Sequence, residues 1–269
     1  MKAPLKRSAA TEVFYGPEDG RLVVVYHIQK TAGTALRHVV RRNLGDAEVE
    51  LLPGLAELRH TRTELLDWYA QWYGSLAADQ RARLRCVMSH LAGYLLPALD
   101  RPADAMVLVR EPVDRTLSYW HAKARRREGR KHMPSLEEIY AREPDRKKPE
   151  RWEQFHNWQS RALLAVFHDV SELRFGAEPP ADADVWRERL RALVADVFTV
   201  GVQDDLPGFV RVLAQRHGWA KTAVPQSKAN ERRAEIDVSA ELRETILAHN
   251  WLDQELYELA RVAQLAAAR

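Results

Sequence analysis

A short stretch, residues 21–36 (RLVVVYHIQKTAGTAL), constrains the fold more than any other part of the chain. Its β-branched apolar run, residues 23–25, predicts a strand buried on both faces of a parallel sheet. A polar turn follows, and from Thr34 the apolar residues recur at helical spacing. A strand, a tight turn and a helix N-terminus can bind an anion, because unpaired N–H groups and the helix dipole point at the ligand. Lys30 adds a positive charge, and Thr31 and Thr34 add hydroxyl donors. For a turn considered alone, an ordinary polar connection between a strand and a helix is the preferred interpretation, so other features must decide.

Composition is that of a globular protein. The 269 residues fit one domain, and 46% hydrophobic residues can build a sizeable core. The net charge of +3 favours anionic ligands. The single cysteine, Cys86, excludes an intramolecular disulfide and a cysteine-based zinc cluster, and we expect it to be a buried apolar side chain. Residues 1–10 lack the apolar core of a secretory signal, and no apolar run reaches the roughly 20 residues of a membrane span. We therefore expect a cytoplasmic protein.

Two further predicted strands end in polar residues. Residues 85–90 form a short strand that ends at His90, and residues 106–110 form one that ends at Arg110. Ligands in open α/β sheets bind outside the carboxyl ends of the strands. We therefore expect Lys30, His90 and Arg110 to meet in one crevice, with a structural ion pair as the alternative role for Arg110.

The remaining segments complete a single α/β domain over residues 1–269. Residues 1–19 form a polar lead-in, and residues 197–202 form a fourth strand. A helix over residues 63–73 carries four aromatic side chains, for which core packing is favoured over stacking on sugar rings. Residues 123–151, rich in charge and proline, are a candidate mobile loop or lid. The order of elements predicts a central, mostly parallel sheet flanked by helices.

Two segments resemble a known family. Residues 27–36 (HIQKTAGTAL) resemble the 5′-phosphosulfate-binding loop of carbohydrate sulfotransferases of the heparan sulfate 2-O/6-O type and their bacterial relatives. Residues 110–120 (REPVDRTLSYW) are similar to the 3′-phosphate-binding segment of that family, an Arg at a strand end followed by a Ser eight positions on. Residues 157–161 and 250–259 also resemble family sequence. Gln29 stands where the family usually has proline, a difference that bears on the stiffness of the loop.

The resemblance implies a P-loop-like sulfotransferase fold and in-line transfer of a sulfuryl group from 3′-phosphoadenosine 5′-phosphosulfate (PAPS) to an acceptor hydroxyl. The product is adenosine 3′,5′-bisphosphate, and no metal is implied. Lys30 would neutralise charge on the leaving group, since positioning and charge stabilisation dominate such transfers. Arg110 and Ser118 would hold the 3′-phosphate, which the planar guanidinium suits. The candidate donor-binding residues are Lys30, Thr31, Ala32, Gly33, Thr34, Ala35, Arg110, Ser118, Lys228 and Asn230.

The reaction needs a base for the hydroxyl proton, and histidine is the usual choice near neutral pH. Among the ten histidines we choose His90, which ends its strand in a segment that resembles the catalytic histidine segment of the family. The alternative for His90 is a side chain satisfied by backbone hydrogen bonds. His27 is expected to brace the turn, and His121 ranks third.

Two other classes of protein remain alternatives. A P-loop kinase or NTPase needs Gly-x-x-x-x-Gly-Lys-Ser/Thr and a strand-end acid for magnesium, whereas here Lys30 precedes Gly33 and Arg110 ends the strand. A non-catalytic binder of anionic glycan or nucleotide would keep the loop but would not need His90.

The basic run over residues 123–132 bears on the choice of partner. It is a solvated helix end, a contact for an acidic polysaccharide or a nucleic-acid patch. No nucleic-acid motif accompanies it, so we expect no nucleic-acid partner. The expected acceptor is a carbohydrate or another hydroxyl-bearing molecule, and an anionic one fits the basic run.

Overall fold

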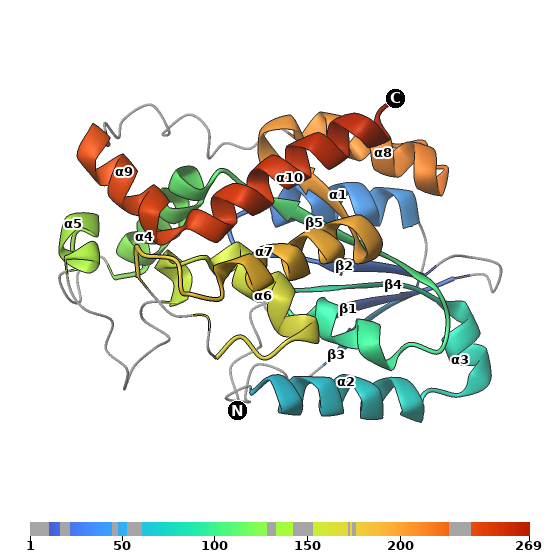
Figure 1. The fold of residues 1–269 in the computed structure, drawn as a ribbon. Helices are drawn as coiled ribbons and strands as arrows, with labels where there is room; N and C mark the ends of the chain where they lie inside the picture. The colour runs from blue at the N-terminus through green and yellow to red at the C-terminus, as the bar shows by residue number, and fades with distance from the viewer. Residues whose placement is uncertain are drawn as a thin grey trace.

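The computed structural model describes residues 11–16, 22–44, 48–52, 61–127, 133–141, 153–171, 173, 176–225 and 238–269. These residues form a six-stranded sheet between layers of helices, in the order β3-β1-β4-β2-β5-β6 (Figure 1). The last four strands in this order run parallel, and β1 and β3 are antiparallel additions at one edge. The predicted α/β domain with a mostly parallel sheet is confirmed. The strands are β1 (Thr11–Tyr15), β2 (Leu22–Tyr26), β3 (Glu48–Leu52), β4 (Leu84–Ser89), β5 (Ala103–Val109) and β6 (Phe198–Val202).

The helices agree in most places with the sequence pattern, which predicts, for example, a helix over residues 206–217, the bounds of α8. The pattern also predicts one helix over residues 150–166, and this is the main departure, because the described part is interrupted at His156 and Asn157. The α-helices are α1 (Gly33–Leu44), α2 (Arg62–Ser75), α3 (Ala78–Arg83), α4 (Pro112–Arg127), α5 (Leu136–Tyr140), α6 (Trp158–Phe167), α7 (Ala183–Ala192), α8 (Leu206–His217), α9 (Ala240–His249) and α10 (Trp251–Ala267). The 3₁₀-helices are η1 (Ala92–Ala98), η3 (Glu153–Phe155) and η5 (Gln203–Asp205), and η4 (Leu193–Val197) is a π-helix.

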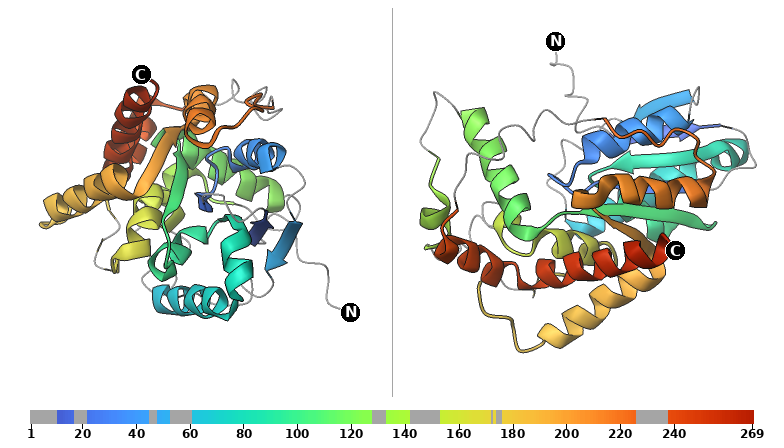
Figure 2. Two further views of the ribbon diagram at one scale, coloured as in Figure 1. Left: turned by 90° about the vertical axis from the view of Figure 1, so that its right-hand side faces the viewer. Right: turned by 90° about the horizontal axis from the view of Figure 1, so that it is seen from above.

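Both faces of the sheet are buried, as the apolar run in β2 predicts. Val23 and Val25 pack on one face against α1 and α8, while Val24 and Tyr26 pack on the other. Figure 2 shows α1 and α8 on one side of the sheet, with α2, α6 and α7 on the other and α10 along β6. Full burial of each such side chain contributes about 1.5–3 kcal/mol. The core therefore holds β2, and the loop that follows it, in the middle of the sheet.

A third group of buried side chains lies beyond the carboxyl end of β5. It joins α4, α5, η3 and α9, and includes Tyr119, Tyr140 and Phe155. Figure 1 shows α4, α5 and α9 together at one end of the molecule. Part of the segment proposed as a lid belongs to this group, because α5 packs there and is capped by Ser135, whose hydroxyl accepts from the N–H of Glu138. Residues 128–132 and 142–152 lie outside the described residues, so the lid stays a prediction.

The polar lead-in predicted over residues 1–19 is too long, because part of it is a strand. Residues 11–15 form β1, and all five are buried. The strand escaped the sequence pattern because its apolar run, Val13–Tyr15, is only three residues long and follows the polar pair Thr11 and Glu12. Its carboxylate pairs with Arg41 at 2.9 Å and with Arg37 at 3.5 Å, both on α1. A buried charge is tolerated where it is paired in this way.

The aromatic residues of α2 serve the core. Tyr69 and Tyr73 are buried, and the half-buried Trp68 and Trp72 pack beside them with their rings nearly parallel. This arrangement agrees with the predicted role of these aromatic side chains in core packing. Cys86 is a buried free thiol in β4, as expected. Within the described ranges, no helix has both the length and the apolar character required to cross a bilayer.

Candidate active site

The loop between β2 and α1 has an unusual backbone. Lys30 and Ala32 have φ angles of 75° and 64°, in the left-handed region. Neither is glycine, so each costs on the order of 1–3 kcal/mol and must be held by its surroundings. Turns of this kind direct successive N–H groups into a concavity that suits an anion, and the N-terminus of α1 follows immediately.

The two threonines of the loop have different surroundings. The Thr31 side chain is fully buried, and its hydroxyl donates to the carbonyl oxygen of Ile28 at 2.9 Å. The hydroxyl therefore braces the loop, and only the backbone N–H of Thr31 remains for an anion. Thr34 is exposed in the first turn of α1, where its hydroxyl can reach a ligand.

His27 is wedged against the start of α1. A Cβ atom on Gly33 would lie 1.6 Å from Nε2 of His27, so only glycine leaves room for the ring. The His27 ring also lies against that of His90, with centroids 4.3 Å apart. Burial lowers the pKa of His27 to about 3, and the charges of His90, Arg37 and Lys30 act in the same direction. His27 is thus a neutral brace, as expected from the sequence.

His90 contacts the same loop. Its Nδ1 lies 2.5 Å from the carbonyl oxygen of His27. A carbonyl only accepts, so Nδ1 carries the hydrogen and Nε2 carries the lone pair of the neutral ring. Burial lowers the pKa of His90; the bond to His27 opposes the shift, and the charge of Arg37 adds to it. The ring is therefore neutral at pH 7, the state that a base requires.

Arg110 joins the end of β5 to the loop. Its Nη1 donates to the carbonyl oxygen of Lys30 at 3.3 Å. Since His90 contacts the loop through His27, the segments of Lys30, His90 and Arg110 converge as the strand ends predicted. Ser118 is half-buried in the second turn of α4. The other two candidate donor residues, Lys228 and Asn230, lie outside the described residues.

The backbone of Arg110 is held by Gln159, a polar residue for which the sequence leaves two roles open, lining the cleft and facing solvent. The Arg110 N–H donates to Oε1 of Gln159 at 2.8 Å, and Nε2 of Gln159 donates back to the Arg110 carbonyl oxygen at 2.8 Å. Gln159 lies in α6 and is fully buried. Nothing in its helical spacing separates it from a solvent-facing polar residue, so only the fold reveals this contact.

Arg115 of α4 is a second residue that sequence reasoning missed. Only 1% of it is exposed, and its guanidinium donates to the backbone and side-chain oxygens of Gln154. Its Nε lies 3.5 Å from the carbonyl oxygen of Gln29. Burial lowers its pKa to about 10, so it keeps its charge at neutral pH. The sequence did offer one signal for this role: Arg115 is a charged residue one helical turn before Tyr119, on the apolar face of the helix.

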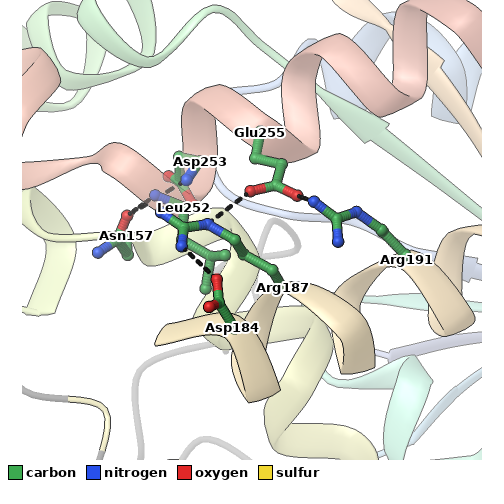
Figure 3. Close-up of polar contacts among 7 residues, drawn as sticks. All are labelled: Asn157, Asp184, Arg187, Arg191, Leu252, Asp253 and Glu255. Carbon is green, nitrogen blue, oxygen red and sulfur yellow. Dashed lines mark hydrogen bonds and ion pairs between the residues drawn. The ribbon is translucent and has the colours of Figure 1, made fainter. Parts of the chain in front are cut away.

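The two weaker stretches of family-like sequence pack against one another. Asn157 directly precedes α6 with a left-handed φ of 45°, and its side-chain oxygen accepts from the N–H groups of Leu252 and Asp253 in α10 (Figure 3). The sequence pattern predicts Asn250 as the N-cap of α10, and Asn250 has that position, but its side chain makes no capping hydrogen bond to α10. Its side-chain oxygen accepts from the N–H of Asn157, and its amide donates to the carbonyl of Phe155. The ends of the two helices are thus joined crosswise.

A peripheral ion-pair group ties α10 to α7. The carboxylate of Glu255 bridges Arg187 and Arg191, and Arg187 also pairs with Asp184 at 2.8 Å (Figure 3). These partners are largely at the surface, so each pair contributes at most about 1 kcal/mol. The buried crosswise contacts join α6 to α10, and the ion-pair group adds a surface link between α7 and α10.

One comparison with known proteins gives a match. A family model described as "Sulfotransferase domain" matches residues 23–172, which is 150 of 269 residues and more than half of the chain. The matched range begins in β2 and therefore includes the Lys30 loop, His90 and Arg110. No curated protein matches the chain.

Proposed function

Because the chain belongs to the sulfotransferase domain family and is thus an enzyme that transfers a sulfuryl group, we propose that its donor is PAPS and its acceptor a carbohydrate hydroxyl. The match to the sulfotransferase family also argues against the alternative of a P-loop kinase or NTPase. The observation that carries the proposal is the meeting of three groups at one end of the sheet: the left-handed Lys30 loop, Arg110 on that loop, and a neutral histidine, His90.

The donor has two anionic ends, and the site offers two groups of cations and donors. In the proposal, the loop N–H groups, Lys30 and Thr34 hold the 5′-phosphosulfate at the N-terminus of α1. Arg110 and Ser118 hold the 3′-phosphate. The 3.3 Å contact between Arg110 and the Lys30 carbonyl supports this assignment, because it keeps the two groups at a constant separation.

His90 is the proposed base. The acceptor oxygen attacks sulfur as its proton passes to Nε2 of His90, and the bond between sulfur and the 5′-phosphate oxygen breaks. Lys30 neutralises the charge left on that oxygen. The His27 carbonyl still accepts from Nδ1–H of the resulting imidazolium, and so stabilises its positive charge. This geometry serves a base that starts neutral and becomes charged during transfer.

The acceptor class rests on the likeness of residues 27–36 and 110–120 to the carbohydrate branch of the family. The aromatic residues of α2 add no support, because they pack in the core. The acceptor is therefore best found by assay with a panel of neutral and acidic glycans.

Calorimetric titration with adenosine 3′,5′-bisphosphate and with ATP tests the donor. We expect the bisphosphate to bind in the micromolar range or tighter and ATP to bind far more weakly. Tight binding of ATP alone would overturn the proposal. The acceptor panel, incubated with PAPS and analysed by mass spectrometry, should show a gain of one sulfate on a glycan. Transfer only to small non-carbohydrate alcohols would replace the carbohydrate assignment.

A further inference from the structure

We propose that Gln159 is a positioning residue for the 3′-phosphate of the donor, because it holds the backbone of Arg110 from both sides. The inference rests on the proposed function, in which Arg110 binds that phosphate. It adds a residue on a separate helix that determines how well Arg110 does so.

The geometry resembles an added strand. The parallel ladder of β5 with β6 ends at the pair Val109 and Val202, so Arg110 lies one residue past its last backbone partner. The primary amide of Gln159 supplies the missing donor and acceptor, each at 2.8 Å. A glutamine or asparagine amide is the neutral side chain that offers both groups at one end. Gln159 thus continues the backbone hydrogen bonding of β5 by one residue, from Val109 to Arg110, the proposed ligand of the 3′-phosphate.

The amide is itself held in one orientation. The backbone N–H of Gln159 donates to Oδ2 of Asp253 at 3.1 Å, and its Nε2 lies 3.5 Å from the same oxygen. A carboxylate oxygen beside Nε2 favours the amide with nitrogen on that side, so Oε1 faces the N–H of Arg110. Asp253 is almost fully buried in the first turn of α10. The contacts therefore run from α10 through α6 to the end of β5.

The consequence for binding is preorganisation. A guanidinium on a backbone held at both its N–H and its C=O loses less freedom when it grips a phosphate. Its Nη1 also contacts the Lys30 carbonyl. Removal of the Gln159 amide should loosen Arg110 and weaken the grip on the 3′-phosphate, while the 5′ end in the Lys30 loop binds as before.

The chain offers a matched control in Gln264 of α10. It is also buried, its Oε1 accepts from the N–H of Val202 at 2.8 Å, and its Nε2 donates to the carbonyl of Asp205 at 3.0 Å. It therefore makes the same kind of two-way contact at the end of the neighbouring strand, β6. None of the candidate donor residues lies on that segment. Loss of either amide should affect folding similarly, but only Gln159 should affect the 3′-phosphate.

The experiment compares the full-length wild type, Gln159→Met and Gln264→Met by calorimetric titration with adenosine 3′,5′-bisphosphate and adenosine 5′-monophosphate. The dissociation constant of the monophosphate divided by that of the bisphosphate measures the contribution of the 3′-phosphate to binding. We expect Gln159→Met to lower this ratio about tenfold or more at unchanged affinity for the monophosphate, and Gln264→Met to keep it. In an Arg110→Ala background, Gln159→Met should lower the ratio no further, because it acts through Arg110.

Each outcome is decisive. A wild-type ratio near one would show that the proposed 3′-phosphate site is wrong, which is a failure of the proposed function. A large wild-type ratio that survives in Gln159→Met would overturn the positioning role alone, and so would an equal loss in Gln264→Met. Where Gln159→Met does not fold, Gln159→Asn keeps a buried amide but is one methylene too short for the two contacts, and the same ratio is measured on it.

Discussion

Asn157 and Asp253 cap each other's helices. The Asn157 side-chain oxygen accepts from the N–H of Leu252 at 2.8 Å and from that of Asp253 at 3.2 Å, at the start of α10. In return, the Asp253 carboxylate accepts from the N–H of Gln159 at 3.1 Å and from that of Ser160 at 2.7 Å, at the start of α6. Each helix N-terminus therefore depends on the other, and the orientation of Gln159 toward Arg110 depends on both.

The exchange of caps predicts a large effect at Asp253. Loss of a cap costs about 0.5–2 kcal/mol, and a buried donor left unsatisfied costs about 1–3 kcal/mol. We expect Asp253→Ala to lower the free energy of unfolding by about 2–4 kcal/mol, measured by urea denaturation. The control is Asp184→Ala, which removes an exposed carboxylate from the first turn of α7 and should cost less than about 1 kcal/mol. Equal effects of the two variants would contradict the buried capping role.

Arg115 should act on the opposite end of the donor from Gln159. Its guanidinium holds Gln154 and lies beside the Gln29 carbonyl, so Arg115→Lys keeps a charge but loses the planar fork. We expect it to weaken adenosine 3′,5′-bisphosphate and adenosine 5′-monophosphate alike, by about tenfold, because both use the loop. Calorimetric titration checks this, with Arg125→Lys on the exposed side of α4 as the control. A loss confined to the bisphosphate would show that Arg115 serves the 3′ end instead.

His90→Ala separates catalysis from binding. Removal of a general base typically costs 10²–10⁴ in rate, so kcat should fall by about that factor. Affinity for adenosine 3′,5′-bisphosphate should stay within about threefold of the wild type, since His90 has no proposed contact with it. Steady-state kinetics and titration together check both parts. His38→Ala, an exposed histidine on α1, should change neither value. Unchanged kcat in His90→Ala would sink the base assignment.

The pH profile follows from the lowered pKa of His90. The base must be neutral, so kcat/KM should fall as pH drops through its folded-state pKa, which lies below the ordinary 6.5 because of burial. We expect kcat/KM to be flat from about pH 7 to 8 and to lose half its value only below pH 6.5. An acidic limb with its midpoint above pH 6.5 would contradict a neutral, buried His90.

The free energy of unfolding should also decrease at acid pH, because of His27. Burial lowers the pKa of His27 to about 3, so the unfolded chain binds a proton that the folded protein excludes. Its contribution to stability is complete above about pH 6.5 and declines toward pH 3, by at most about 1.4 kcal/mol per pH unit. Urea denaturation at pH 7.5 and 5.0 measures the decline. His27→Asn should show a smaller difference between the two pH values, and an equal difference would contradict the assignment to His27.

The local pattern predicted the part of the site that is local in the chain. Residues 23–25 predict a strand buried on both faces, and the polar residues before Thr34 predict the loop that contains Lys30. The carboxyl ends of parallel strands meet at one edge, so the convergence of His90 and Arg110 on the loop also followed from sequence. In contrast, β1 was missed because its apolar run is short and follows a charged residue, Glu12. The pairing of Glu12 with Arg41 of α1 is visible only in the fold.

The sequence by itself determined the buried parallel strand, the turn and the helix over residues 21–36, which is where we propose that the donor binds. Short-range periodicity and the chemistry of a helix N-terminus are properties of neighbours in the chain, so they can be read directly. Only the tertiary structure decided how that place is held together. Gln159 contacts Arg110 across 49 residues and Asp253 across 94, and contacts at such separations leave no periodic trace in the sequence.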